Sequence, residues 1–289
     1  MNIGGSGRSE MDGQAEDSGK PASVKRKTTR WLNPAGGYLE GFTHTLNPYT
    51  GCSFGCSYCY VRRMPVGMFR AEPWGSWVDV KQLDERAFRR EWARESDKGS
   101  LSIFFGSATD PYQPSEAEHG TTRRLLELML ERPPAFLLLQ TRSALIVRDK
   151  ELLKAFGGAI RASITLETDD EAVRRHFTPS APPLAARWRA LRELQEAGVP
   201  VQAAVSPLLP HTHEFAARLA REASRVVVDD FHRGDGSGGR RSAQLGMREQ
   251  YRSLGLEADY APAAADRFYE TLQSFSGVNV HFSRGGFLP

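Results

Sequence analysis

The sequence is poor in cysteine, lacks long apolar runs and has almost no net charge, and each shortage excludes a class of protein. Its 289 residues contain three cysteines, an odd number that gives no framework of paired disulfides. It has no apolar run of about 18 residues, so we expect no membrane-spanning helix. The formal charge of +3 gives no electrostatic basis for tight nucleic-acid binding.

The first 30 residues lack aromatic side chains and any apolar stretch as long as that of a signal peptide. Such a segment buries too little apolar surface to offset the entropy lost on ordering. We therefore predict a disordered tail over residues 1–30, no secretion, and a cytoplasmic location for the protein.

From residue 43 onward, apolar strands alternate with helical patterns. The predicted strands are 43–46, 101–106, 135–140, 160–166, 199–205 and 225–229. Helical spacing of apolar residues occurs at 121–131, 149–156, 182–198 and 212–222. This alternation indicates parallel βαβ units, and six units fit an α/β partial (β/α)6 TIM-like barrel better than a closed barrel of eight. Functional side chains of such barrels lie at the C-terminal ends of the strands.

We assign residues 31–232 to the barrel and residues 233–289 to a small C-terminal extension. The extension begins with the Gly/Ser-rich stretch Arg233–Ser242, which we expect to be a flexible loop. Two helical stretches and a candidate final strand at 278–282 follow it.

The three cysteines lie within eight residues, in a C-x3-C-x2-C pattern: Cys52, Cys56 and Cys59. Thiolates this close together can bind one centre, and soft thiolate ligands select zinc, Cu(I) or an iron–sulfur cluster. A structural zinc site needs four protein ligands, and the nearest histidine in sequence is His44. A [4Fe–4S] cluster on three cysteines instead leaves one iron open for a substrate or cofactor.

The cysteine spacing, with the aromatic Tyr58 directly before the third cysteine, resembles the radical S-adenosylmethionine (SAM) superfamily. Four further segments resemble its spore photoproduct lyase-like branch: Asn47–Cys52, Trp74–Lys81, Thr109–Pro114 and Gln140–Ser143. The resemblance covers residues 30–232 and implies a partial barrel of the radical SAM type. It also implies that the cysteines bind a [4Fe–4S] cluster, which takes an electron from a donor such as flavodoxin or ferredoxin. SAM is then cleaved to a 5′-deoxyadenosyl radical that abstracts hydrogen from a substrate the sequence does not identify.

The resemblance places the ligands of SAM at the ends of the strands. In the family the end of the second strand binds the methionyl amine. The matching candidates here are Ser107, Thr109 and Asp110. These residues also suit a chain-breaking turn, because prolines follow them. At the end of the third strand, Arg142 is a candidate for the SAM carboxylate, or for an ion pair with Asp149 or Glu151.

The fourth strand alternates polar and apolar residues, which places Ser163, Thr165 and Glu167 on one face. A barrel with a ligand in its lumen has this pattern, and we interpret these residues as candidates for the ribose hydroxyls. A solvated face is the alternative. The ring of Tyr58 is a candidate contact for the adenine.

The sequence departs from spore photoproduct lyase in having no fourth cysteine, the residue that lyase uses as a hydrogen donor. Arg142 also stands where lysine is more usual, and His211–His213 replaces a Gly/Asn/Asp-rich turn. Two other functions stay open, namely repair of a DNA lesion and a non-catalytic module that binds an iron–sulfur cluster or zinc. We predict that the protein does not repair spore-type thymine dimers.

Overall fold

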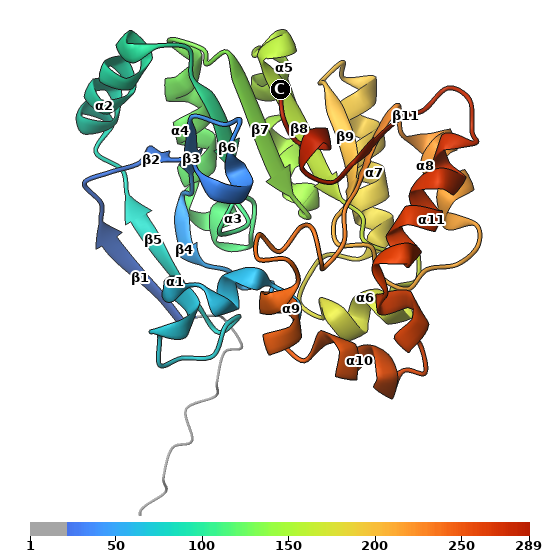
Figure 1. The fold of residues 1–289 in the computed structure, drawn as a ribbon. Coiled ribbons are helices and arrows are strands. Elements are labelled where there is room, and N and C mark those ends of the chain that lie inside the picture. The colour runs from blue at the N-terminus through green and yellow to red at the C-terminus, as the bar shows by residue number, and fades with distance from the viewer. Residues whose placement is uncertain (1–21) are drawn as a thin grey trace, which may run out of the picture.

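An eight-stranded sheet forms the centre of the computed structural model, which describes residues 22–289 (Figure 1). The strand order is β11-β10-β9-β8-β7-β6-β3-β2, and neighbouring strands run parallel except β2 and β3. The bounds are β2 (Asn33–Pro34), β3 (His44–Leu46), β6 (Ser102–Phe105), β7 (Phe136–Thr141), β8 (Ile160–Thr165), β9 (Val201–Val205), β10 (Arg225–Val228) and β11 (Asn279–Phe282).

Side chains alternate between the two faces of the sheet, as period-2 strands require. In β8, Ala162 and Ile164 belong to the largest hydrophobic core, which the helices cover, together with Trp188 of α7. In β7, Leu138 belongs to a separate cluster on the inner face, which faces the lumen. The covering helices are α2 (Glu85–Lys98), α4 (Thr121–Leu130), α5 (Lys150–Lys154), α7 (Leu184–Glu196), α8 (Phe215–Glu222) and α11 (Pro262–Gln273).

The predicted α/β partial barrel is confirmed, and its six parallel strands are β3 and β6–β10. The expected C-terminal extension adds a seventh parallel strand, because β11 pairs with β10, and its helix α11 packs into the main core. The helix predicted at 149–156 differs slightly, since a 3-10 helix (Ala144–Asp149) precedes α5.

A second, three-stranded sheet lies beside the first and contains β4 (Tyr49–Gly51), β5 (Trp77–Gln82) and β1 (Ala22–Lys27). Strand β1 falls within residues 1–30, for which the sequence predicts disorder. Its order comes from backbone pairing with β5 along all six residues, and from an ion pair of 2.9 Å between Arg26 Nε and Asp79 Oδ2. Residues 1–21 of the predicted tail lie outside the described part of the chain.

The segment before β3 meets the end of the chain across the concave side of the sheet (Figure 1). Arg284 donates hydrogen bonds to the carbonyl of Glu40 from Nε and Nη2, at 3.1 and 2.6 Å. Arg161, at the start of β8, donates from Nη1 to the carbonyl of Leu288 at 2.8 Å. We call residues 36–42 and 283–289 the terminal clasp, and it covers the lumen near the N-terminal ends of the strands.

The remaining helices lie in the connections, several of them near the C-terminal ends of the strands. They are α1 (Pro65–Met68), α3 (Ser115–His119), α6 (Glu171–Phe177), α9 (Arg240–Gln244) and α10 (Met247–Ser253). Across residues 22–289, no helix combines the length and the apolar character that crossing a bilayer demands.

Candidate active site

The cysteine loop follows β4 and depends on two glycines with positive φ. Gly51 has φ +84°, and a Cβ there would lie 2.6 Å from the ring of Trp77. Gly55 has φ +58° and faces Gly75, whose Cα would lie 3.2 Å from a Cβ on Gly55. Glycine adopts such φ values without steric cost, so these two positions let the loop turn tightly against β5.

The segment after β6 is tied to the cysteine loop by two of its own side chains, Thr109 and Gln113, and to the residue after β3 by the side chain of Asn47. Thr109 Oγ1 donates to the carbonyl of Gly51 at 2.5 Å, and Gln113 Oε1 accepts from the backbone N–H of Ser53 at 2.9 Å. Asn47 Oδ1 accepts from the backbone N–H of Ala108 at 2.8 Å. The loop is therefore fixed at the C-terminal ends of β3 and β6, where chemistry in such barrels is found.

The three thiols are free of disulfides and line one cavity of about 910 Å³, part of it open to solvent. Burial raises the pKa of all three thiols, and brings that of Cys59 to about 12. The charge of Arg142 opposes this rise at Cys56, because its Nη1 lies 3.0 Å from Cys56 Sγ. Thiolates here need a cationic partner, and a bound metal centre would supply most of that charge.

The donors at this site fit an iron–sulfur cluster better than a closed zinc site. All three cysteines line the same cavity, and three soft thiolate ligands match a cluster with one open iron. Within residues 22–289 of this structure, however, no three cysteine, histidine or carboxylate side chains are already grouped as metal ligands. His44, the candidate fourth zinc ligand, lies elsewhere, since its Nε2 is 3.8 Å from Glu95 Oε2 and its Nδ1 is 3.0 Å from Thr43 Oγ1. The four-ligand zinc site therefore lacks the histidine that the sequence offered for it.

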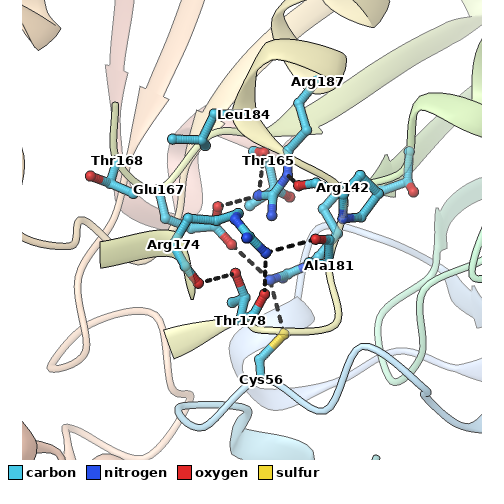
Figure 2. Close-up of polar contacts among 12 residues, drawn as sticks. Cys56, Arg142, Thr165, Glu167, Thr168, Arg174, Thr178, Ala181, Leu184 and Arg187 are labelled. Carbon is cyan, nitrogen blue, oxygen red and sulfur yellow. Dashed lines mark hydrogen bonds and ion pairs between the residues drawn. The ribbon is translucent and has the colours of Figure 1, made fainter. Parts of the chain in front are cut away.

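Arg142 and Glu167 form the polar centre of the site, at the ends of β7 and β8 (Figure 2). Arg142 Nη1 lies 2.7 Å from Glu167 Oε1 and donates at 2.7 Å to the hydroxyl of Tyr58. Arg187 of α7 donates from Nη1 to Glu167 Oε2 at 2.6 Å, and Tyr58 donates its hydroxyl to Glu167 Oε1. The carboxylate of Glu167 thus lies between two guanidinium groups.

These charges keep Glu167 ionised. Burial alone raises the pKa of Glu167, but the charges of Arg187 and Arg142 and the Tyr58 hydrogen bond lower it to about 2. The ion pair expected for Arg142 with Asp149 or Glu151 is not formed, because Arg142 pairs with Glu167 instead. Asp149 is paired with Arg123 and Arg148.

The three candidates for the methionyl amine all line the cavity: Ser107, Thr109 and Asp110. Asp110 also braces the neighbouring strand, since it accepts from Thr141 Oγ1 at 2.5 Å and from the backbone N–H of Arg142 at 2.9 Å. Burial raises the pKa of Asp110. The two interpretations of this segment, ligand binding and turn chemistry, therefore apply to the same side chains.

Of the four candidate contacts for ribose and adenine, two line the cavity in the structure and two do not. Thr165 and Tyr58 line the cavity, and the ring of Tyr58 meets that of Phe231 edge-on at 6.0 Å. Ser163 and Glu167 are buried beneath the cavity and do not line it. Ser163 Oγ accepts from Gln202 Nε2 at 3.1 Å, and Glu167 is fully engaged by its two arginines.

Sequence reasoning missed the wall of the cavity that follows β10. Its residues come from the end of β10 and the Gly/Ser-rich loop: Asp230, Phe231, Gly234, Asp235 and Ser242. The loop is held by Asp235, whose carboxylate accepts from the backbone N–H groups of Ser237, Gly239 and Ser242 at 2.7 to 3.2 Å. The pair of aspartates directly after a buried strand was the signal that could have identified this wall.

Comparison with known proteins assigns the family. The family model described as "Radical SAM superfamily" matches residues 46–222. The chain belongs to the radical SAM superfamily. One relative in sequence is Uncharacterized protein MJ0683 of Methanocaldococcus jannaschii, with 31% identity over 65% of this chain and 68% of the relative. Another is Uncharacterized protein ORF301 of Acidianus two-tailed virus, with 32% identity over 64% of each chain.

Solved structures confirm the radical SAM fold. Spore photoproduct lyase complexed with dinucleoside spore photoproduct matches with a TM-score of 0.64 and 16% identity, over 90% of this chain and 82% of that one. A mutant of that lyase with bound AdoMet and dinucleoside spore photoproduct matches with a TM-score of 0.64 and 17% identity, over 91% and 82%. At such identities the likeness concerns the fold of this radical SAM protein.

Proposed function

We propose that this radical SAM protein is an enzyme that binds a [4Fe–4S] cluster through Cys52, Cys56 and Cys59. The observation that supports this most is that all three free cysteines line one cavity at the C-terminal ends of parallel strands. Such a cluster, when bound and reduced, would supply one electron for reductive cleavage of the C5′–S bond of SAM. The products would be methionine and a 5′-deoxyadenosyl radical, which would remove a hydrogen atom from the substrate.

The polar side chains around the cavity would hold SAM. Arg142 offers a guanidinium for the carboxylate of SAM, because its bond to Glu167 uses only part of the hydrogen-bonding capacity of Arg142. Three acceptors at the end of β6 suit the methionyl ammonium group: Ser107, Thr109 and Asp110. The ribose would lie near Thr165, above Ser163 and Glu167, and the ring of Tyr58 would contact the adenine.

Anaerobic reconstitution tests this proposal. The purified chain, given iron and sulfide, is expected to turn brown and to hold about four irons per chain, as a [4Fe–4S] cluster requires. After reduction with dithionite it is expected to convert SAM to 5′-deoxyadenosine slowly even without substrate. A colourless protein that holds one zinc would instead establish the metal-binding module without radical chemistry.

Arg142→Ala is expected to leave the iron content unchanged and to weaken SAM binding. Loss of one hydrogen bond to a charged group costs about 1.5–3 kcal/mol, which corresponds to about ten- to a hundredfold in affinity. Equilibrium binding of SAM to the reconstituted variant measures the effect. Arg148→Ala is the matched control, because Arg148 pairs with Glu116 and Asp149 away from the cavity. If SAM affinity is unchanged, Arg142 serves only its ion pair with Glu167.

Spore-type thymine dimers are expected to stay unrepaired by this protein. Reversal of that lesion returns a hydrogen atom to a thymine radical, and all three cysteines of this chain line the proposed cluster site. The formal charge of +3 also gives little attraction for duplex phosphates. Incubation of the reduced enzyme with a synthetic dinucleotide photoproduct, followed by chromatography of the restored, uncrosslinked thymidine dinucleotide, measures this. Catalytic formation of that dinucleotide would establish the lesion-repair function instead.

The electron would come from a small carrier such as flavodoxin or ferredoxin. We also assign the protein to the cytoplasm, because three free and mostly buried thiols suit a reducing compartment. To test this electron donor, reduced flavodoxin replaces dithionite in the assay, and formation of 5′-deoxyadenosine is measured.

A further inference from the structure

A second chamber adjoins the cysteine cavity inside the barrel, and its volume of about 480 Å³ includes a part open to solvent. The two share five wall residues: Tyr60, Phe104, Gln140, Ser206 and Gly234. The terminal clasp supplies the opposite wall, through Tyr38, Arg284 and Phe287. A molecule in this chamber would therefore lie next to the space proposed for SAM, with the clasp behind it.

The chamber contains a buried carboxylate, that of Asp229, directly after β10. Its side chain accepts from the hydroxyl of Tyr38 at 2.8 Å and from the backbone N–H of Asp230 at 2.9 Å. Within residues 22–289, no lysine, arginine or histidine lies within ion-pair distance of Asp229, which is 1% exposed. Burial raises the pKa of Asp229 to about 6.

Such a carboxylate is costly to maintain for structure alone. Buried charges are normally paired, and the hydrogen bonds from Tyr38, the Asp230 backbone and the Ser283 side chain still leave part of the acceptor capacity of Asp229 unused. The wall of this chamber also contains a basic residue, Arg284, but that side chain is bonded to Glu40 and not to Asp229. Unpaired, perturbed carboxylates in a cavity are characteristic of ligand sites.

The rest of the chamber wall is largely aromatic. Phe42, Phe104 and Phe287 belong to one hydrophobic cluster, and Tyr38 lies beside them in the wall. Aromatic faces attract organic cations, and a carboxylate completes the recognition of an ammonium group. Asp229 would repel a phosphate or carboxylate ligand, while the positive charge of Arg284 in the same wall is already paired with Glu40. The chamber is thus complementary to a small apolar molecule that carries an amine.

We infer that the Asp229 chamber binds the substrate through a protonated amino group, whose N–H bonds Asp229 accepts while the aromatic wall contacts the substrate's apolar part. This inference rests on the proposed function, because it places the substrate beside the SAM site. The site of hydrogen abstraction would then lie at the end of the substrate away from its amine, toward the cysteine cavity. Asp229 acts here as a binding residue that fixes the orientation of the substrate.

Probe binding tests this inference without turnover. Benzylammonium chloride, its neutral counterpart benzyl alcohol, and thymidine are titrated by calorimetry at neutral pH into the reconstituted protein with SAM bound. We expect benzylammonium to bind at least tenfold more tightly than benzyl alcohol. Equal affinities for benzylammonium and benzyl alcohol would overturn the inference. Binding of thymidine alone would also overturn it, because it would indicate that the chamber takes a neutral nucleobase.

Asp229→Asn is expected to weaken benzylammonium binding at least tenfold and to leave benzyl alcohol unaffected. Asp79→Asn is the matched control, because Asp79 is also buried but lies in the small sheet with Arg26 and Arg70. The comparison of probes on the unmodified protein decides the question even if Asp229→Asn fails to fold. Formation of 5′-deoxyadenosine is measured separately, so that failure of SAM cleavage and failure of amine binding are distinct results.

Discussion

Replacement of any one of Cys52, Cys56 or Cys59 by alanine is expected to abolish the brown colour and all SAM cleavage. Each thiolate is one of only three protein bonds to the proposed cluster, and the chain has no other cysteine to replace it. Iron and sulfide content, the electron paramagnetic resonance signal after reduction, and 5′-deoxyadenosine formation measure the loss.

Ser57→Ala is the matched control for the three cysteine variants. Ser57 lies in the same loop, and its buried hydroxyl has no hydrogen-bond partner in the described part of the chain. The control should therefore keep its cluster and its cleavage activity. Full cluster occupancy in any single cysteine variant would show that the ligand assignment is wrong.

Glu167→Ala is expected to cause the largest loss of stability of any single change near the cavity. The substitution leaves Arg187, which is fully buried, and Arg142 without their shared counter-charge. Breaking a buried ion pair by removal of one partner costs about 3–5 kcal/mol in the free energy of unfolding. Urea denaturation of the unreconstituted protein measures this without any contribution from a bound cluster.

The same carboxylate predicts how stability varies with pH. The pKa of Glu167 in the folded protein, about 2, lies below its ordinary value, so its contribution is fully present above about pH 5. That contribution should be lost as the pH falls through about 4 toward 2. Glu167→Ala should remove this part of the acid dependence, and an unchanged profile would contradict the ion-pair network.

Glu116→Ala separates stability from SAM binding. Glu116 is equally buried and pairs with Arg148, but it lies outside the cavity wall. We expect both glutamate variants to lose stability, while only Glu167→Ala also weakens SAM binding, because Arg142 loses the partner that positions it. If both variants bind SAM alike, Glu167 has a structural role only.

The sequence by itself predicted the three candidate metal ligands and determined the class of fold. Three cysteines within eight residues can converge on one centre whatever the rest of the chain does, and Gly51 and Gly55 permit the turns they need. The alternation of strands and helices is likewise a local pattern, because the period of apolar residues shows in each segment separately. Both predictions therefore needed no knowledge of distant contacts.

Tertiary structure alone decided which polar groups meet. Arg142 pairs with Glu167 because β7 and β8 are neighbours in the sheet and their ends coincide, which no local pattern encodes. Strand β1 is ordered only through β5, some 50 residues away in the chain. The Asp229 chamber exists because the segment before β3 meets the C-terminal segment, with Glu40 and Arg284 in contact across 244 positions. Such contacts depend on strand order and on packing between distant segments, which residue periodicity does not specify.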